Sequence, residues 1–134
     1  MKVTLIIRSE LTASHSLDGF EQPHPHRWKL EARISGAPVR GRIIDLPVLE
    51  DALKADLRSL EGCYLNESPL VDDATRAFPT CETLGAYLAT HWDRVVLSRF
   101  RGENPSLTLV SVQVTLCEMD GREFGAALIE PGTP

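Results

Sequence analysis

The sequence is short of cysteine, of positive charge and of long apolar runs, and each shortage excludes a class of protein. Its three cysteines form no Cys-x-x-Cys pair, so we expect free thiols rather than a disulfide framework or a thiolate zinc knuckle. The chain has fourteen basic and nineteen acidic residues, which gives a net charge of -5. This negative charge argues against binding to nucleic acid. No apolar run reaches the roughly 20 residues that span a bilayer, so we expect no membrane contact and a cytoplasmic location.

Length and composition predict one ordinary globular domain over residues 1–134. The chain has 134 residues, of which 43% are hydrophobic and 25% charged. These values are typical of a single domain of common size and exclude intrinsic disorder. The sequence shows no internal repeat, low-complexity tract or domain boundary.

Alternation of polar and apolar residues predicts four strands. The predicted ranges are 3–11, 24–34, 107–117 and 124–129. In the second range, the two histidines and the apolar residues fall on one side and the charged residues on the other, as in a half-buried antiparallel strand. His15 is expected just beyond the first strand. A turn through Asp120 and Gly121 joins the last two strands as a hairpin.

Leucine spacing and capping residues predict two helices. The first begins after Asp45, which caps it, and has Pro47 in its first turn. Its apolar stripe consists of Leu46, Leu49, Leu53, Leu57 and Leu60. After a polar loop over residues 62–78, the second helix follows Thr80 as its cap. Its inner face is expected to consist of Leu84, Tyr87, Leu88 and Val95.

The order of these elements predicts an α+β fold. Two strands, two helices and two strands (ββααββ) form a four-stranded antiparallel sheet with two helices on one face. The other face of the sheet and both of its edges are then left open. For so small a chain, self-association into a homo-oligomer is the natural way to cover them.

Three histidines suggest a metal site. His24 and His26 project to the same side of a strand, because they are two residues apart. With His15 they can offer three nitrogens to one zinc ion, and three histidines without a fourth protein ligand describe an open, catalytic zinc site. The alternative is a packing pair on a strand with no metal. His91 is expected to be a packing or surface residue.

Six short motifs in order resemble the family of 6-pyruvoyl-tetrahydropterin synthase and bacterial 6-carboxy-tetrahydropterin synthase. They are Ala13-Ser14-His15-Ser16-Leu17, His24-Pro25-His26-Arg27-Trp28, Gly41-Arg42-Ile43-Ile44-Asp45-Leu46, Leu60-Glu61-Gly62-Cys63-Tyr64-Leu65-Asn66, Pro79-Thr80-Cys81-Glu82 and Val114-Thr115-Leu116-Cys117-Glu118. The resemblance implies the tunnelling fold, in which trimers close their sheets into a barrel and two trimers stack into a hexamer. It also implies zinc on His15, His24 and His26, in a site shared between neighbouring subunits.

The resemblance further implies a small-molecule substrate, dihydroneopterin triphosphate, whose side-chain hydroxyls can chelate zinc. Zinc would then act as a Lewis acid while protons move along that side chain. Glu118 would hold two adjacent N–H donors of the pterin ring, and Thr80 and Cys81 would add contacts to the ring. Without the resemblance, Glu118 would be a solvated carboxylate at the end of a strand.

The sequence departs from the family where proton transfer is performed. The family's cysteine base corresponds to Phe20, and a family histidine corresponds to Gly62. Glu21 is the expected substitute base, with Glu61 as a second carboxylate. Some members of the family replace the cysteine by glutamate and release a two-carbon aldehyde. Cys63 and Cys81 are alternative sources of a thiol, although a free cysteine is often an inert small hydrophobe.

Three hypotheses follow from these observations. The first is a zinc-dependent pterin lyase that uses Glu21 and Glu61 in proton transfer. The second is a divergent zinc enzyme of the same fold that cleaves or cyclises another carbonyl-containing biosynthetic substrate. The third is a non-catalytic homologue that binds zinc or a pterin.

Overall fold

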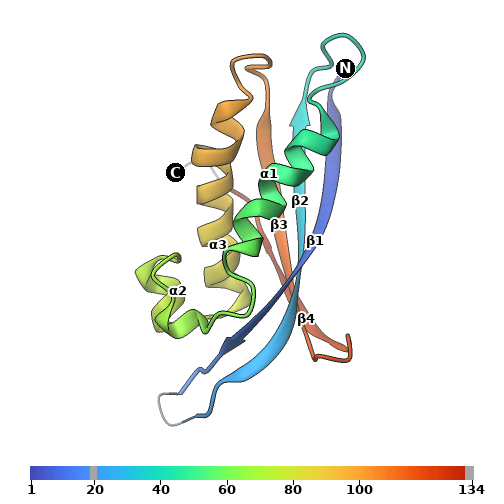
Figure 1. The fold of residues 1–134 in the computed structure, drawn as a ribbon. Helices are drawn as coiled ribbons and strands as arrows, with labels where there is room; N and C mark the ends of the chain where they lie inside the picture. Colours follow the sequence, from blue (N-terminus) through green and yellow to red (C-terminus); the bar gives the residue numbers. More distant parts are fainter. Residues whose placement is uncertain (19–20, 132–134) are drawn as a thin grey trace.

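The computed structural model describes residues 1–18 and 21–131 and confirms the predicted α+β architecture. Four strands form one antiparallel sheet in the order β1-β2-β3-β4, and Figure 1 shows helices α1 and α3 on the same side of it. The main elements are β1 (Val3–His15), β2 (His24–Gly36), α1 (Leu46–Arg58), α2 (Asp73–Ala77), α3 (Cys81–His91), β3 (Thr108–Cys117) and β4 (Glu123–Ile129).

Strand β1 is longer than the sequence predicts, and His15 is its last residue rather than a loop residue. The pairing with β2 continues without interruption from Val3 opposite Gly36 to His15 opposite His24. Polar residues near the end of β1 do not stop the strand, because they alternate with the buried residues Leu11 and Ala13.

The core lies between the sheet and the two longer helices. The predicted inner side of β2 is confirmed, and it packs with apolar residues from α1 and α3. The fully buried members include Trp28, Leu30, Ile34, Leu49, Leu53, Leu84 and Leu88. Gly85 lets α3 approach the sheet, since a Cβ at this position would lie 2.6 Å from Cγ1 of Ile129 on β4.

Helix α1 begins as predicted. The Asp45 side chain accepts a hydrogen bond from the Val48 N–H at 3.4 Å, and a proline occupies the first turn. Leu49, Leu53 and Leu57 are buried, which confirms the centre of the leucine stripe. Leu46 is instead exposed, and Leu60 is buried beyond the end of the helix.

Helix α3 begins after Thr80, as predicted, and continues as a π-helical turn over Trp92–Val96. A π turn contains more residues than an α turn, so it rotates the following side chains relative to an α-helical pattern. As a result Val96 is buried, whereas Val95 is 45% exposed. The expectation that Val95 lies on the inner face was therefore wrong.

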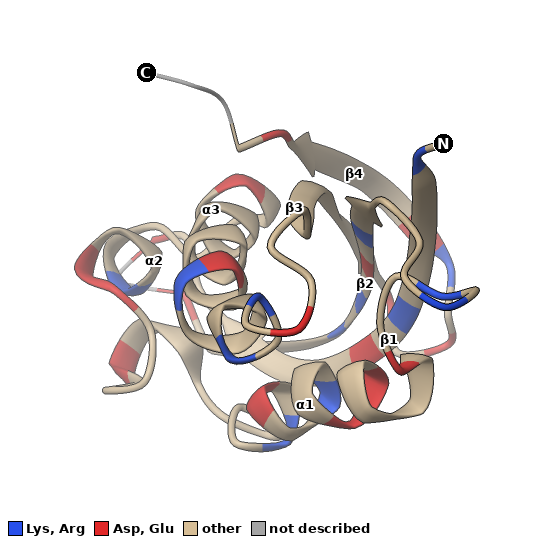
Figure 2. Cartoon of the chain, turned by 90° about the horizontal axis from the view of Figure 1, so that it is seen from above, with Lys and Arg blue, Asp and Glu red and all other residues tan. Residues whose placement is uncertain are grey.

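The predicted polar loop of residues 62–78 contains two short helical segments. They are a 3-10 turn over Leu65–Glu67 and helix α2, which is capped by the side chain of Asp72. Figure 2 shows acidic and basic residues interspersed on α1 rather than separated by sign. Within residues 1–18 and 21–131, no helix is long and apolar enough to cross a membrane.

Candidate functional site

The predicted metal-binding histidines lie at one end of the sheet, near the connection between β1 and β2. His15 is paired directly with His24, and Ala13 is paired with His26. Residues paired in this way share a face, so all three histidines belong to the same corner of the sheet. The rings of His15 and His26 are in edge-to-face contact, with centroids 4.8 Å apart.

Backbone carbonyls fix the orientation of two of these rings. The Nδ1 atom of His15 donates to the carbonyl of Pro79 at 2.7 Å, and Nδ1 of His26 donates to the carbonyl of Cys117 at 3.1 Å. Each bond leaves Nε2 as the nitrogen with a free lone pair, which is how metal-binding histidines are commonly oriented. Burial lowers the pKa of His15 and favours the neutral ring that a metal requires.

The His24 ring lies next to Glu21. Its Nε2 atom lies 3.7 Å from Oε1 of Glu21, and its side chain is half exposed. In the described part of the chain, no three His, Cys, Asp or Glu side chains converge closely enough to hold a metal ion. The structure therefore brings His15 and His26 together, while His24 remains on the Glu21 side.

Glu21 closes the turn that follows β1. Its Oε2 atom accepts hydrogen bonds from the N–H groups of Leu17 at 2.9 Å and Asp18 at 3.3 Å. These backbone bonds lower the pKa of the Glu21 carboxyl group. The carboxylate is therefore ionised near neutral pH, and it is a weak base. Phe20, at the position of the family's cysteine, lies outside the described residues.

Glu61 contacts the outer edge of β1. Both of its carboxylate oxygens accept a hydrogen bond from the N–H of Thr12, at 3.2 and 3.1 Å. Because β1 is an edge strand, this N–H has no partner strand, and the carboxylate satisfies it. The structure thus gives Glu61 a positioning role at the edge of the sheet.

The segment after Glu61 runs along the same edge and supports the end of β1. The Ser14 N–H donates to the Cys63 carbonyl at 2.9 Å. The Asn66 side chain accepts from the Ser16 N–H at 2.9 Å and donates to the Ser16 carbonyl at 2.8 Å. His15 is therefore held between two bonded neighbours. Sequence reasoning missed this function of Asn66, although an amide can replace a strand partner in this way.

Thr80 and Cys81 directly follow Pro79, whose carbonyl binds the His15 ring; Thr80 is the N-cap of α3 and Cys81 its first residue. The hydroxyl of Thr80 accepts from the Thr83 N–H at 3.2 Å as part of a capping box. Burial raises the pKa of the Cys81 thiol to about 11. The Cys81 thiol is therefore protonated near neutral pH rather than a reactive thiolate.

Glu118 directly follows Cys117, the last residue of β3. The carbonyl of Cys117 accepts a hydrogen bond from the His26 ring, and Cys117 is paired with Arg27, so Glu118 lies one residue beyond the contact between β3 and His26. The backbone N–H of Glu118 donates to the carbonyl of Arg122 at 2.8 Å and closes the β3–β4 turn. The predicted ring anchor is thus adjacent to the histidine corner.

Two residues of this corner were not recognised in the sequence. The ring of Phe124 contacts the ring of His26, with centroids 5.9 Å apart. The Arg122 guanidinium lies over the Phe124 ring at 5.1 Å, and its Nη2 is 3.6 Å from Oε1 of Glu118. The signal available in the sequence was an arginine two residues before an aromatic residue at the start of a strand.

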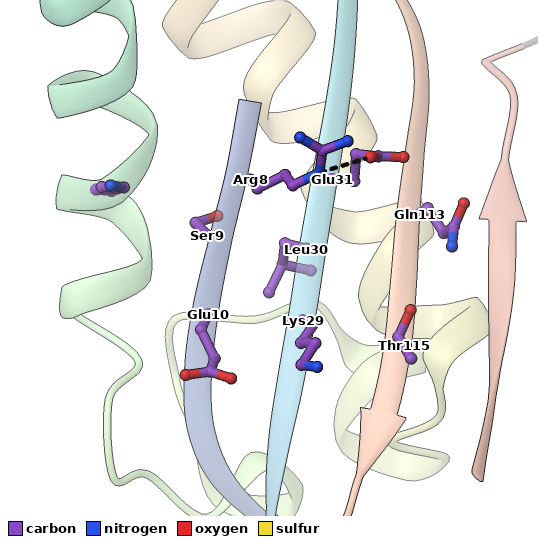
Figure 3. A pocket seen from close by; sticks show the side chains of 9 residues that line it. Arg8, Ser9, Glu10, Lys29, Leu30, Glu31, Gln113 and Thr115 are labelled. Atoms are coloured by element: carbon purple, nitrogen blue, oxygen red, sulfur yellow. Dashed lines mark ion pairs between the residues drawn. The ribbon is translucent and has the colours of Figure 1, made fainter. Parts of the chain in front are cut away.

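A hollow elsewhere on the sheet is lined by none of the predicted site residues. It has a volume of about 620 Å³, and Figure 3 shows its mixed-charge lining, with Arg8 and Glu31 joined by an ion pair of 3.2 Å. The main polar lining residues are Arg8, Glu10, Lys29, Glu31, Gln113 and Thr115. Because acidic and basic side chains alternate in its lining, this hollow is a poor match to the predicted zinc and pterin chemistry.

Comparison with known proteins gives one family. The sequence matches the family of 6-pyruvoyl tetrahydropterin synthase over residues 4–124. No curated protein matches the sequence.

Solved structures with a similar fold include three from different organisms. The 6-pyruvoyl tetrahydropterin synthase of Plasmodium vivax is 15% identical, with a TM-score of 0.67 over 97% of this chain and 99% of that chain. The Caenorhabditis elegans enzyme of the same name is 15% identical, with a TM-score of 0.66 over 98% and 97%. An uncharacterized protein from Wolinella succinogenes is 11% identical, with a TM-score of 0.72 over 98% and 99%.

Proposed function

Because the chain belongs to the 6-pyruvoyl tetrahydropterin synthase family, we propose that it is a zinc-dependent lyase acting on a pterin like dihydroneopterin triphosphate. The observation that carries the proposal is the histidine corner. His15 and His26 each donate through Nδ1 to a backbone carbonyl and so keep Nε2 available, with their rings in contact. Glu118 follows Cys117, whose carbonyl binds the His26 ring, and in this proposal its carboxylate binds the substrate ring.

The proposed zinc ligands are His15, His24 and His26. His15 and His26 fit this role, because a ring fixed through Nδ1 presents Nε2 to a cation. Burial also lowers the pKa of His15 and favours the neutral ring that a metal requires. His24 fits it only if its ring leaves Glu21, to which Nε2 is now 3.7 Å distant. When bound, zinc supplies Lewis acidity toward oxygen atoms of the substrate side chain.

The remaining residues would bind the ring and move protons. In this proposal the Glu118 carboxylate accepts two N–H groups of the pterin, while Thr80 and Cys81 contact the same ring from the start of α3. Glu21 is the proposed proton acceptor because it lies next to His24; its carboxylate is ionised and can take up a proton, although its lowered pKa makes it a weak base. Glu61 contributes indirectly by holding Thr12, and so the end of β1, in place.

We also propose a homo-oligomer, a trimer or hexamer, with each site shared between subunits. In one chain β1 and β4 are the outer strands of the sheet, and both carry exposed apolar residues. Ile6 on β1 and Leu128 on β4 are each about half exposed. Unpaired strand edges with apolar side chains are favourable surfaces for association.

A second candidate function is favoured by the replacement of the residues that transfer protons in the family. Phe20 replaces the family's cysteine and Gly62 its histidine, and burial raises the pKa of both Cys63 and Cys81. A thiol-dependent version of the reaction therefore has little support in this chain. The second candidate is a zinc enzyme of the same fold that cleaves or cyclises another carbonyl-containing substrate.

The first experiment is metal analysis of the purified protein. We expect on the order of one zinc per chain, as three histidine ligands without a fourth protein ligand require, and a His24→Ala protein should lose most of it. A His91→Ala protein is the matched control, because His91 pairs with Asp56 on the helix layer. Wild-type protein that contains no zinc after purification, and binds none when zinc is added, would contradict the metal site.

The second experiment is incubation with dihydroneopterin triphosphate, followed by mass analysis of the products. Conversion by the wild-type protein supports the pterin lyase, and a Glu21→Gln protein should be slower by roughly 100-fold or more if Glu21 is the base. Unchanged substrate with zinc-loaded protein would reject the pterin reaction and favour the second candidate.

A further inference from the structure

The side chain of Arg122 is held beside the proposed ring anchor by two separate contacts. Its Nη2 lies 3.6 Å from Oε1 of Glu118, and its guanidinium lies over the Phe124 ring at 5.1 Å. A cation at this distance from the face of an aromatic ring is attracted to it. Phe124 in turn contacts His26, so Arg122 is linked to the histidine corner.

The backbone around Arg122 fixes this placement independently of its side chain. The Glu118 N–H donates to the Arg122 carbonyl at 2.8 Å, and the Arg122 N–H donates to Oδ1 of Asp120 at 2.9 Å. Gly121 has a φ of 95°, which a glycine adopts without strain. Glu118 and Arg122 therefore face each other across the end of a closed hairpin, with their side chains on the same side.

Together Glu118 and Arg122 place two hydrogen-bond acceptors, the carboxylate oxygens, beside the N–H donors of a guanidinium. The Glu118 carboxylate can only accept hydrogen bonds when ionised, and a guanidinium can only donate. An amino-lactam ring such as a pterin presents two N–H donors followed by a carbonyl acceptor along one edge. A neutral 2,4-diaminopteridine has an amino group in place of that carbonyl and no hydrogen on the adjacent ring nitrogen. It would therefore direct a donor toward the guanidinium and offer the carboxylate one N–H fewer.

We propose that Arg122 is a specificity-determining residue that donates to the ring carbonyl of an amino-lactam substrate while Glu118 accepts from its two N–H groups. This inference rests on the proposed function, because it assumes that Glu118 is the ring anchor. Phe124 acts as a positioning residue that holds the guanidinium beside Glu118. A site built around such a pair rejects a ring that lacks the acceptor.

The test compares two probes that differ only at this edge, 6-hydroxymethylpterin and 2,4-diamino-6-hydroxymethylpteridine. Their binding is measured by fluorescence titration at a pH where both rings are neutral, so turnover is not needed. The wild-type protein should prefer the lactam, and Arg122→Met should reduce that preference about tenfold, the effect of losing one hydrogen bond to a charged group. Phe124→Leu should reduce it by a smaller factor, and Glu118→Gln should weaken both probes.

Arg94→Met is the matched control, since Arg94 is an exposed arginine on the π-helical turn. It should keep the wild-type preference, and Arg122→Lys, a second variant at the site, should lose part of it. If wild-type protein binds the lactam probe through Glu118 but Arg122→Met keeps the full preference, the inference is overturned and the proposed function stands. If wild-type protein binds neither probe, or Glu118→Gln has no effect, the proposed ring site itself is overturned.

Discussion

The rings of His15 and His26 show how the histidine corner is built from single residues. Each ring uses one nitrogen to bind a carbonyl from another element, Pro79 before α3 or Cys117 at the end of β3. These bonds orient the rings before any ligand arrives. The corner therefore depends on elements that are far apart in the sequence and meet only in the folded chain.

The same corner contains a thiol that we expect to be unreactive. The pKa of Cys81 is about 11 because the thiol is buried, so its thiolate fraction near neutral pH should be on the order of 100-fold below that of an unperturbed cysteine. Alkylation of native protein by iodoacetamide, followed by peptide mass analysis, should be slow at Cys81 and should accelerate as the pH approaches 11. Urea-unfolded protein is the control, in which Cys81 should react rapidly.

The raised pKa of Cys81 also predicts how the free energy of unfolding changes with pH. The unfolded thiol ionises near pH 8.5, whereas the folded thiol stays protonated until about pH 11. The folded state therefore binds more protons between these values, and the free energy of unfolding should fall as the pH rises through this interval. Rapid alkylation of folded protein at neutral pH would contradict the buried, neutral thiol.

At the scale of the element, Gly85 allows α3 to pack closely on the sheet. A Cβ there would lie 2.6 Å from Cγ1 of Ile129 and 3.1 Å from Cγ2 of Val114. Alanine would favour the helix by about 1 kcal/mol, but overpacking costs about 1–3 kcal/mol. We therefore expect Gly85→Ala to lower the free energy of unfolding by about 1 kcal/mol in urea titrations.

A double-mutant cycle separates the clash from the helix effect. In an Ile129→Ala background the main clash is removed, so Gly85→Ala should then be neutral or slightly stabilising. Equal destabilisation in both backgrounds would show that the contact between α3 and β4 is not the cause.

At the scale of the molecule, the open sheet predicts assembly. Ile6 and Leu128 pair with Arg33 and Gln113, whose side chains alternate with the core positions of β2 and β3. These two apolar side chains therefore belong to the sheet face away from the helices. Light scattering during gel filtration should show a trimer or hexamer, and Leu128→Lys should shift it toward the monomer.

A matched control for this prediction lies on the helix layer. Val48 on α1 is 49% exposed, nearly the same fraction as Leu128, so Val48→Lys should leave the assembly intact. A monomeric wild-type protein, or equal loss of assembly in both variants, would contradict association through the sheet.

The elements of this protein follow from short-range patterns that the sequence contains. The leucine steps of α1, the caps Asp45 and Thr80, and the alternation in β2 each depend on residues a few positions apart. The structure confirms both caps, the alternation and the centre of the leucine stripe, whereas Leu46 is exposed and Leu60 lies beyond the helix. The position of Val95 was predicted wrongly because a π turn changes the helical period.

The contacts of the site were decided only by the tertiary structure. The sequence by itself predicted the three histidines, Glu118 and the start of α3 as residues of the site. It could not show that Glu61 bonds to Thr12 or that Glu21 closes a turn. Periodicity reports which face a residue occupies, whereas hydrogen-bond partners depend on segments that are distant in the sequence and become neighbours only when the sheet and helices pack.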